Sequence, residues 1–410
     1  MNMQSTPPPL KPTVLIVGGG VAGLEAVFAL AELAPGMADT TLISPNPEFV
    51  YKPLTVEEPF TGRPAPSYEL APLLEAAGAT LLCGTLESVD PGARSIRLAG
   101  GPEVAYDALI VSIGARPRPA FEGVRTFWHG FNRLAVDELI DDALKSPGHL
   151  LNLVVPPGTG WPLPLYELAL MLRLRAEARG DRDRMRIRLM TPEQGPLLIF
   201  GQKASDAVAR LLSARRIEFQ GGKQVVDDRG IPADVPSGEP LPTIGPVVAL
   251  PILEGPKVPG LPADPHGFIS IGPACEVHGC PGVYAAGDGT TFPLKQGGLA
   301  TQQADAAVER VAASLGAAVE PAPFRPILRG KLLTGTDPLN LSNDAGETVA
   351  ASRQPLWWPS DKISGRYLPK ALRGTADDSE PPLASRPIEV EVSLPCEWHS
   401  EPMLPYVGPG

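Results

Sequence analysis

Three glycines near the start of the chain have the spacing of a turn that binds a phosphate group. Gly18, Gly20 and Gly23 follow an apolar run, 14–17, and precede an Ala- and Leu-rich run, 21–34. In a strand–turn–helix unit the first glycine allows the tight turn and the second lets backbone approach a pyrophosphate, while the third lets the helix pack on the strand. The helix N-terminus then offers N–H groups and a positive dipole end to the phosphates. The spacing predicts a dinucleotide site.

A second segment, far along the chain, makes this expectation more specific. Residues 282–288 read Gly-Val-Tyr-Ala-Ala-Gly-Asp, an apolar strand that ends in Gly287 and Asp288. A glycine turn paired with a distant strand ending in Gly-Asp is typical of enzymes that bind FAD. The two segments together favour a flavin over a nicotinamide as the tightly held cofactor.

Side chains that could do redox chemistry are harder to identify. Lys295 lies close to the start of a predicted helix, 298–315, and could stabilise the negative charge of a reduced flavin. Cys275 and Cys280 form the one close cysteine pair, and Cys280 is either redox-active or a small buried hydrophobe. The catalytic residues are therefore unassigned, with Lys295 and Cys280 as candidates. No Cys or His spacing predicts a metal site.

Composition excludes several classes of function. The 410 residues carry a net charge of −11, which argues against a nucleic-acid partner because phosphate binding needs a basic face. No apolar run reaches the ~18 residues of a membrane span, and residues 1–12 are polar and proline-rich, without a signal-peptide core. The four cysteines are too scattered for a secreted disulfide framework. We predict a cytoplasmic protein.

The alternation of strands and helices predicts an α/β fold with parallel, doubly wound sheets. Strands are expected at 13–17, 40–43 and 79–83, with helices at 21–34 and 69–77, and residues 87–104 predict a small antiparallel addition. A second α/β unit starts near His149. We predict two Rossmann-like domains, the second inserted into the first. The expected limits are 12–130 with 265–325 for an FAD-binding domain, 131–264 for a degenerate NAD(P)-binding-like domain, and 326–410 for a C-terminal extension.

These residues resemble the flavoproteins that have two dinucleotide-binding domains, the pyridine nucleotide-disulfide oxidoreductase-like family. Within that family the resemblance is closest to sulfide:quinone oxidoreductases and type II NADH dehydrogenases. It rests on the turn 18–25, the strand and loop 41–53, the strand 106–115 and the segments 283–288 and 295–304. It covers roughly residues 12–325 and implies FAD as the cofactor.

The cofactor contacts expected from these matches lie in the glycine turn, at the ends of three further strands and at the start of a late helix. They are Gly18, Gly19, Gly20, Val21, Ala22, Gly23, Ser44, Pro45, Lys52, Leu86, Ser112, Ile113, Gly114, Gly287, Asp288, Lys295, Gln296 and Gly297. Ser44 stands about 20 positions past Gly23, where an acidic residue usually binds the ribose, and a serine can make only part of that contact.

The chain departs from the family in its second unit. A second glycine turn is expected after the strand 150–155, but residues 156–164 read Pro-Pro-Gly-Thr-Gly-Trp-Pro-Leu-Pro. Proline has no N–H to offer a phosphate, so we expect this domain to serve as scaffold and wall rather than bind NAD(P)H. The sulfide enzymes place a redox cysteine in this turn before a Tyr-Glu pair; here Tyr166-Glu167 is present, but Trp161 stands in the place of the cysteine.

The sequence therefore predicts an FAD-dependent oxidoreductase that resembles sulfide:quinone oxidoreductase, with the second nucleotide site and the redox cysteine degraded. Its small-molecule electron donor and acceptor are unidentified, and a quinone is one expected acceptor. The alternatives are an NAD(P)H:quinone or ferredoxin reductase-like flavoenzyme, and a flavin-binding subunit without turnover.

The C-terminal extension allows two interpretations. Its mixture of aromatic and cationic residues, from Leu356 to Leu372, suits either a peripheral contact with the inner face of a membrane or a strap that packs Trp357 and Trp358 on the FAD domain. Further strand-like residues occur near 388–393. The oligomeric state is not predicted.

Overall fold

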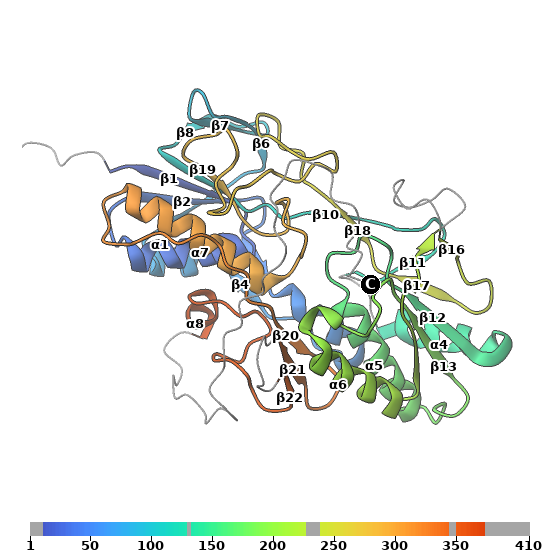
Figure 1. Ribbon diagram of the computed structural model, residues 1–410. Coiled ribbons are helices and arrows are strands. Elements are labelled where there is room, and N and C mark those ends of the chain that lie inside the picture. Colours follow the sequence, from blue (N-terminus) through green and yellow to red (C-terminus); the bar gives the residue numbers. More distant parts are fainter. Residues whose placement is uncertain (1–10, 129–132, 227–237, 344–349, 374–410) are drawn as a thin grey trace, which may run out of the picture.

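Two parallel sheets form the framework of the computed structural model, which describes residues 11–128, 133–226, 238–343 and 350–373 (Figure 1). The first sheet has five strands in the order β19-β9-β1-β2-β5, and every neighbouring pair is parallel. Its strands are β1 (Thr13–Val17), β2 (Asp39–Ser44), β5 (Thr80–Cys83), β9 (Ala108–Val111) and β19 (Val283–Ala285).

Two long helices cover this sheet. Helix α1 (Val21–Leu33) and helix α7 (Gly297–Ser314) lie side by side, although they are far apart in the sequence (Figure 1). Small buried residues such as Ala26, Ala29, Ala304 and Ala307 line both helices, and they allow the helices to approach closely. The shorter helix α3 (Leu70–Ala76) leads into β5.

The second sheet also has five parallel strands, in the order β11-β17-β12-β13-β14. Its strands are β11 (Arg125–Thr126), β12 (Leu150–Val154), β13 (Arg186–Met190), β14 (Ile217–Gln220) and β17 (Val247–Ala249). Its helices are α4 (Arg133–Lys145), α5 (Leu163–Ala178) and α6 (Gln202–Ala214), with short η2 (Pro147–His149) and η3 (Leu198–Phe200). Because β19 returns to the first sheet afterwards, the predicted insertion of one Rossmann-like unit into the other is confirmed.

An antiparallel pair, β10 (Arg116–Arg118) with β18 (Ile252–Glu254), carries the chain into the second unit and out again. Strand β11 follows β10 directly and pairs with β17 of the second sheet. We therefore propose that the second domain begins ahead of Arg125 and not at residue 131, and we retain the other expected limits as proposals.

Smaller elements surround the first sheet. The predicted antiparallel addition is confirmed as β6 (Leu86–Asp90), β7 (Ser95–Leu98) and β8 (Glu103–Ala105). A hairpin of β3 (Glu48–Val50) and β4 (Ser67–Glu69) encloses η1 (Lys52–Glu57) and α2 (Glu58–Thr61), two helical turns that the sequence analysis did not predict. A further small pair, β15 (Val225–Val226) with β16 (Glu239–Pro240), lies on the side of the second sheet, between β14 and β17 in the sequence (Figure 1).

The described part of the C-terminal extension folds back onto both domains. Strands β20 (Arg329–Leu332), β21 (Leu339–Ser342) and β22 (Ala351–Ser352) form an antiparallel sheet, and helix α8 (Leu368–Arg373) packs beside α1 (Figure 1). Trp357 is buried and Trp358 lies half-buried under Arg373, which favours the strap interpretation. The strand-like residues near 388–393 lie outside the described residues.

No helix within the described ranges combines the length and the apolar character that crossing a bilayer requires.

Packing at the first glycine turn leads to a prediction about stability. A Cβ atom on Gly23 would lie 1.8 Å from the carbonyl oxygen of Gly18, whereas a Cβ atom on Gly20 would have no atom within 4 Å. We expect Gly23→Ala to lower the free energy of unfolding by about 1–3 kcal/mol or more, because backbone must shift to admit the methyl group. Gly20→Ala is the control, and denaturant midpoints measure both. Equal midpoints for the two variants would contradict the packing argument.

Candidate functional site

The glycine turn lies at the carboxyl edge of the first sheet, where doubly wound proteins bind nucleotides. Gly18 has a φ of +119° and donates its N–H to the carbonyl oxygen of Ile43 at 2.8 Å. A Cβ atom there would lie 2.4 Å from the carbonyl oxygen of Ser112. Only glycine fits this position, as the sequence analysis expected.

Gly20 faces open space. It is the N-cap of α1 in extended conformation, with φ −95° and ψ −166°, and no side chain caps the helix. The N–H groups of the first helical turn are thus not engaged by a capping side chain, as an anion site requires. Open space beside the backbone and an uncapped helix N-terminus fit the pyrophosphate of a dinucleotide. Val21, Ala22 and Gly23 form the helical turn that would face it.

The expected contact residues at the ends of β9 and β19 come together beside this turn. The hydroxyl oxygen of Ser112 lies 3.0 Å from the carbonyl oxygen of Val17 and 3.2 Å from that of Gly18. Ile113, which follows, exposes 38% of its surface, and Gly114 has a φ of +71°. After the end of β19, a Cβ atom on Gly289 would lie 2.8 Å from the carbonyl oxygen of Gly114. The ends of β9 and β19 therefore border the glycine turn.

Residues at the far end of β2 lie along the same edge. Ser44 is buried, and its hydroxyl donates to the carbonyl oxygen of Asn46 and accepts the N–H of Asn46. The ribose contact expected of Ser44 remains a prediction, with one lone pair of its oxygen left for it. Gly84 donates its N–H to the carbonyl oxygen of Ser44, which brings the segment toward Leu86 to this edge. Pro45 and Lys52 are exposed.

Charges gather where β19 ends. Burial raises the pKa of Asp288, and the ammonium groups of Lys295 and Lys52 oppose that rise. Burial also lowers the pKa of Lys295 to about 8, against the attraction of Asp288 and Asp264. The Lys295 ammonium donates to the carbonyl oxygen of Thr290 at 2.6 Å and lies 3.9 Å from the centre of the Phe268 ring. Lys295 is thus held in place by its neighbours, with a pKa of about 8.

Helix α7 begins immediately after Lys295. The Gln296 side chain accepts the N–H of Leu299 at 2.8 Å and donates to the carbonyl oxygen of Arg329, so it caps the helix. This engagement gives Gln296 a structural role beside its expected cofactor contact. A Cβ atom on Gly297 would lie 3.1 Å from the Ile363 side chain of the C-terminal strap. The family resemblance places the start of α7, at Gly297, beside the flavin ring, and this contact remains a prediction.

The turn that follows β12 of the second domain packs against this site. The carbonyl oxygen of Gly160 accepts the N–H of Lys295 at 3.3 Å, and a Cβ atom on Gly160 would lie 2.7 Å from the carbonyl oxygen of Pro293. Pro156 and Pro157 are buried. Trp161 packs edge-on against the Phe200 ring, 5.9 Å between centroids. The turn is a wall of the flavin-side site.

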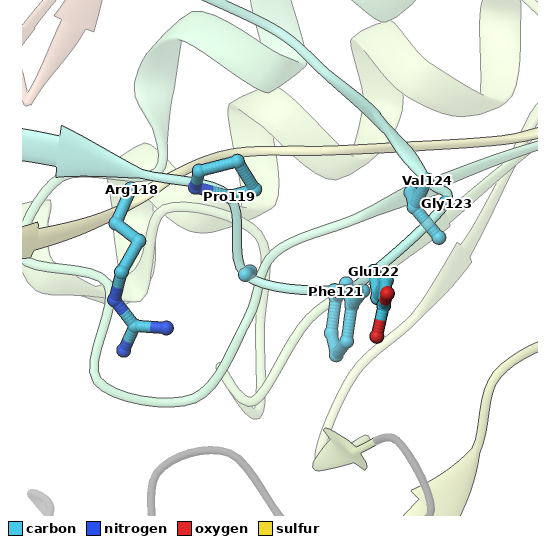
Figure 2. Close-up of a pocket in the computed structure, with 7 residues that line it drawn as sticks. Arg118, Pro119, Phe121, Glu122, Gly123 and Val124 are labelled. Atoms are coloured by element: carbon cyan, nitrogen blue, oxygen red, sulfur yellow. The ribbon is translucent and has the colours of Figure 1, made fainter.

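The carboxyl edge of the second sheet is filled by apolar side chains. Val154, Met190 and Ala249, the last residues of three adjacent strands, cluster with Ala120 and Phe121 from the linker between the domains. Phe121 is 2% exposed, and its loop, residues 118–124, lines a surface hollow (Figure 2). A nucleotide bound to a doubly wound sheet would need this edge.

The cysteine candidate lies elsewhere. Cys280 precedes β19. The carbonyl oxygen of the nearby Gly282 accepts the N–H of Leu109, which places this segment at the amino end of the strands. The glycine turns occupy the opposite edge. Burial raises the pKa of Cys280 and, more strongly, that of Cys275, which disfavours their thiolates. The structure does not bring Cys280 to the candidate site, and a thiol held as a small hydrophobe suits its place.

Two acid groups have partners that the sequence analysis did not identify. Glu167 is fully buried on α5 and binds the Lys362 ammonium through both carboxylate oxygens at 2.7 Å; it also accepts the N–H of Leu333. Burial raises the pKa of Glu167 to about 7, although Lys362 opposes the shift. The Tyr166-Glu167 pair was visible in the sequence, but nothing local identified Lys362 as its partner.

The second acid is Glu193, which is half-buried just after β13. Its carboxylate accepts the Tyr166 hydroxyl at 2.6 Å and the Thr191 hydroxyl at 3.0 Å. Burial raises the pKa of Glu193 to about 7. An acid after the second strand of a dinucleotide-binding unit usually meets a ribose. Here it is bound by the protein's own hydroxyl groups.

Comparison with known proteins identifies the family. The sequence profile of the pyridine nucleotide-disulphide oxidoreductase family matches residues 12–310. The chain belongs to this family. Its members are flavoproteins, and the chain is a flavin-dependent oxidoreductase with FAD as its cofactor.

Individual relatives are more distant. A sulfide-quinone reductase of Aquifex aeolicus (strain VF5) is 28% identical over 165 residues, which are 38% of this chain and 37% of the relative. The match thus spans little more than a third of that protein.

Solved structures share the fold over most of the chain. The sulfide:quinone oxidoreductase from Aquifex aeolicus superposes with a TM-score of 0.70 at 21% identity, covering 83% of this chain and 86% of that one. A ferredoxin reductase from Rhodopseudomonas palustris gives a TM-score of 0.57 at 18% identity, with 83% and 84% coverage.

Gly20 provides a direct test of the expected cofactor contacts. The extended backbone at Gly20 accepts any L-residue and its surroundings are open, so Gly20→Val should leave the apoprotein intact. We expect it to abolish FAD binding, because the side chain fills the space required by the pyrophosphate. Absorbance of the purified protein and FAD release on denaturation measure the effect. Gly92→Val, in an exposed turn, is the control; a yellow Gly20→Val protein would contradict the assignment.

The buried ion pair gives a second test. We expect Lys362→Met to lower the free energy of unfolding by about 3–5 kcal/mol, because it leaves the Glu167 charge buried without its cation. Adding Glu167→Gln should recover part of this loss, since no charge then remains. Lys370→Met, at an exposed lysine on α8, should change stability by less than about 0.5 kcal/mol. If Lys362→Met were as stable as the wild type, the ion pair between Glu167 and Lys362 would not be formed in solution.

Proposed function

We propose that this flavoenzyme takes electrons from a small-molecule donor other than NAD(P)H and passes them to a quinone. We further propose that it does so without the cysteine-based sulfur relay of ordinary sulfide oxidation. The observation that carries the proposal is the filled carboxyl edge of the second sheet.

Three features of the second domain support the exclusion of nicotinamide nucleotides. Phe121 and its apolar neighbours occupy the strand ends, buried prolines replace donors in the turn, and Glu193 is held by Tyr166. A dinucleotide at this edge would compete with the 2%-exposed phenyl ring of Phe121 and with the hydroxyl groups that bond Glu193. Displacing the ring or breaking these bonds costs free energy that the remaining backbone donors could not offset.

The cysteines support the absence of a sulfur relay. A relay needs thiolates close to the flavin, since the thiolate is the form that attacks sulfur. Of the cysteines in the described residues, Cys280 is buried at the amino edge of the sheet and Cys275 is buried beside β19, and burial disfavours both thiolates. Cys83 is exposed at the end of β5. Trp161 occupies the turn where the sulfide enzymes place their cysteine.

The residues of the site have definable tasks. FAD, when bound, supplies the capacity to accept and deliver electrons. Lys295 and the N-terminus of α7 place positive potential beside the expected ring site. Glu167 and Lys362 form a buried ion pair that ties α5 to the C-terminal segment.

A quinone acceptor implies contact between the protein and the membrane, because long-chain quinones are apolar and dissolve in the bilayer. We propose a cytoplasmic protein that touches the inner face of the membrane peripherally. The sequence similarity to a sulfide-quinone reductase supports a quinone as the proposed acceptor.

Anaerobic stopped-flow spectroscopy of the holoprotein tests the proposal. We expect no rapid bleaching of the flavin by micromolar NADH or NADPH, and reoxidation of chemically reduced protein by a soluble quinone. Rapid bleaching by either nucleotide would favour the NAD(P)H-dependent alternative. Failure of quinone to reoxidise the flavin would remove the proposed acceptor and favour the ferredoxin-type or non-catalytic alternative.

A cysteine variant tests the second part of the proposal. We expect Cys280→Ser to leave flavin reduction by sulfide, at whatever rate the wild type shows, unchanged within about twofold, because the thiol lies at the far edge of the sheet and its thiolate is disfavoured. Sulfide-dependent reduction of a soluble quinone is measured for both proteins. Fast turnover that disappears in Cys280→Ser would overturn the claim and make Cys280 catalytic.

A further inference from the structure

Gly287, which follows the end of β19, lies where three elements of the first domain meet. Its φ of +86° is in the left-handed region that favours glycine. A Cβ atom there would lie 3.4 Å from that of Ala22, in the first turn of α1, and 3.6 Å from that of Ala300 on α7. The position of Gly287 is therefore tied both to the first glycine turn and to α7.

The protein itself engages both polar backbone groups of Gly287. The N–H donates to Oε1 of Gln303 at 2.7 Å, and Gln303, on α7, is 2% exposed. The carbonyl oxygen accepts the hydroxyl of the fully buried Thr290 at 2.9 Å and the N–H of the same residue at 3.1 Å. Because one N–H and two lone pairs are the whole capacity of a peptide unit, Gly287 has no group left to bond a cofactor.

Asp288 differs from its neighbours in this respect. On one side Gly287 is held as described, and on the other the carbonyl oxygen of Gly289 accepts the N–H of Ile269 at 2.9 Å. The Asp288 carboxylate is half-buried, and within the part of the chain that the structure describes it accepts no hydrogen bond. A polar side chain that is unpaired between two fixed neighbours is suited to bind a ligand.

We propose that Gln303 is a positioning residue of the FAD site: it holds the N–H of Gly287 so that Asp288, and not Gly287, makes the polar contact with the cofactor. Gln303 acts through the backbone of the turn and not by touching FAD. The inference rests on the expected cofactor contact at Asp288, and it does not depend on the identity of the electron donor or acceptor.

Removal of the Gln303 acceptor should affect cofactor binding more than folding. Without that oxygen, the turn of the free protein can shift until water reaches the N–H of Gly287. Binding of FAD requires the original turn, in which the N–H is buried and would then have no partner. A buried donor without a partner is costly, so the cost of the substitution falls mainly on the complex with FAD.

Dilution of the full-length holoprotein, with the fluorescence of the released FAD as the signal, measures the dissociation constant. We expect Gln303→Leu to raise this constant at least about fivefold. Gln302→Leu is the matched control on the same helix, because Gln302 makes three hydrogen bonds, to Gly298 and Ile327, and none to Gly287. It should lower the thermal midpoint at least as much but change the dissociation constant less than about twofold. Equal weakening of FAD binding in both variants would overturn the proposal.

Two further variants separate the role of Gln303 from the premise about Asp288. Gln303→Glu keeps an acceptor oxygen at the same reach in either protonation state, so it should bind FAD within about threefold of the wild type. A Gln303→Glu protein that binds as weakly as Gln303→Leu would show that the hydrogen bond to Gly287 is not what matters. Asp288→Ala should itself weaken FAD binding. Unchanged binding in Asp288→Ala would remove the premise, whereas weaker binding there with unchanged binding in Gln303→Leu would overturn the role of Gln303 alone.

Discussion

Backbone packed directly on backbone at the carboxyl edge of the first sheet is the constraint on which the rest of the structure depends. The chain at Gly18 meets Ser112, Gly23 meets Gly18, and Gly289 meets Gly114, each at a separation that a methyl group would close. Three loops that are distant in the sequence are therefore held within a few ångströms of one another. Because backbone makes these close approaches, peptide groups shape much of the space that remains for a dinucleotide.

The second domain repeats the architecture with the opposite result. Its parallel strands end in a cluster of apolar side chains, and its acids turn inward to bond with partners in the protein. The same fold thus provides a binding edge in one unit and a packed core in the other. The second unit then acts mechanically: its first turn braces Lys295, and α5 holds the strap through Glu167. Fold alone does not decide which use a domain has.

Most of the framework could be predicted from the sequence because it depends on local patterns. The glycine spacings, the apolar strands and the order of the two units are encoded over short windows. The helical turns of η1 and α2 were missed because residues 52–61 have no apolar period. Strand β11 was missed because two residues carry no period at all.

The polar anchors of the site could not be predicted for a different reason. Glu167 and Lys362 are 195 positions apart, and Glu25 binds backbone groups 341 to 343 positions away. A lone glutamate in an apolar helix gives no information about its partner. The place of Phe121 could not be predicted either. A phenylalanine in a linker indicates burial, but it does not indicate which residues it packs against. Such pairings are fixed only when the whole chain is folded.

The discontinuity of the first domain has a consequence for synthesis. Strand β9 lies between β1 and β19, and α1 packs against α7. Strand β9 and helix α1 are synthesised early, but their partners β19 and α7 are synthesised only after the entire second unit. On the ribosome, the second unit can fold as a contiguous piece while the first is still incomplete. During that interval Ala26, Ala29 and Leu30 of α1 lack the helix that buries them, and the edge of β9 lacks its neighbour. We expect the nascent chain, rather than the finished protein, to be the form most dependent on chaperones.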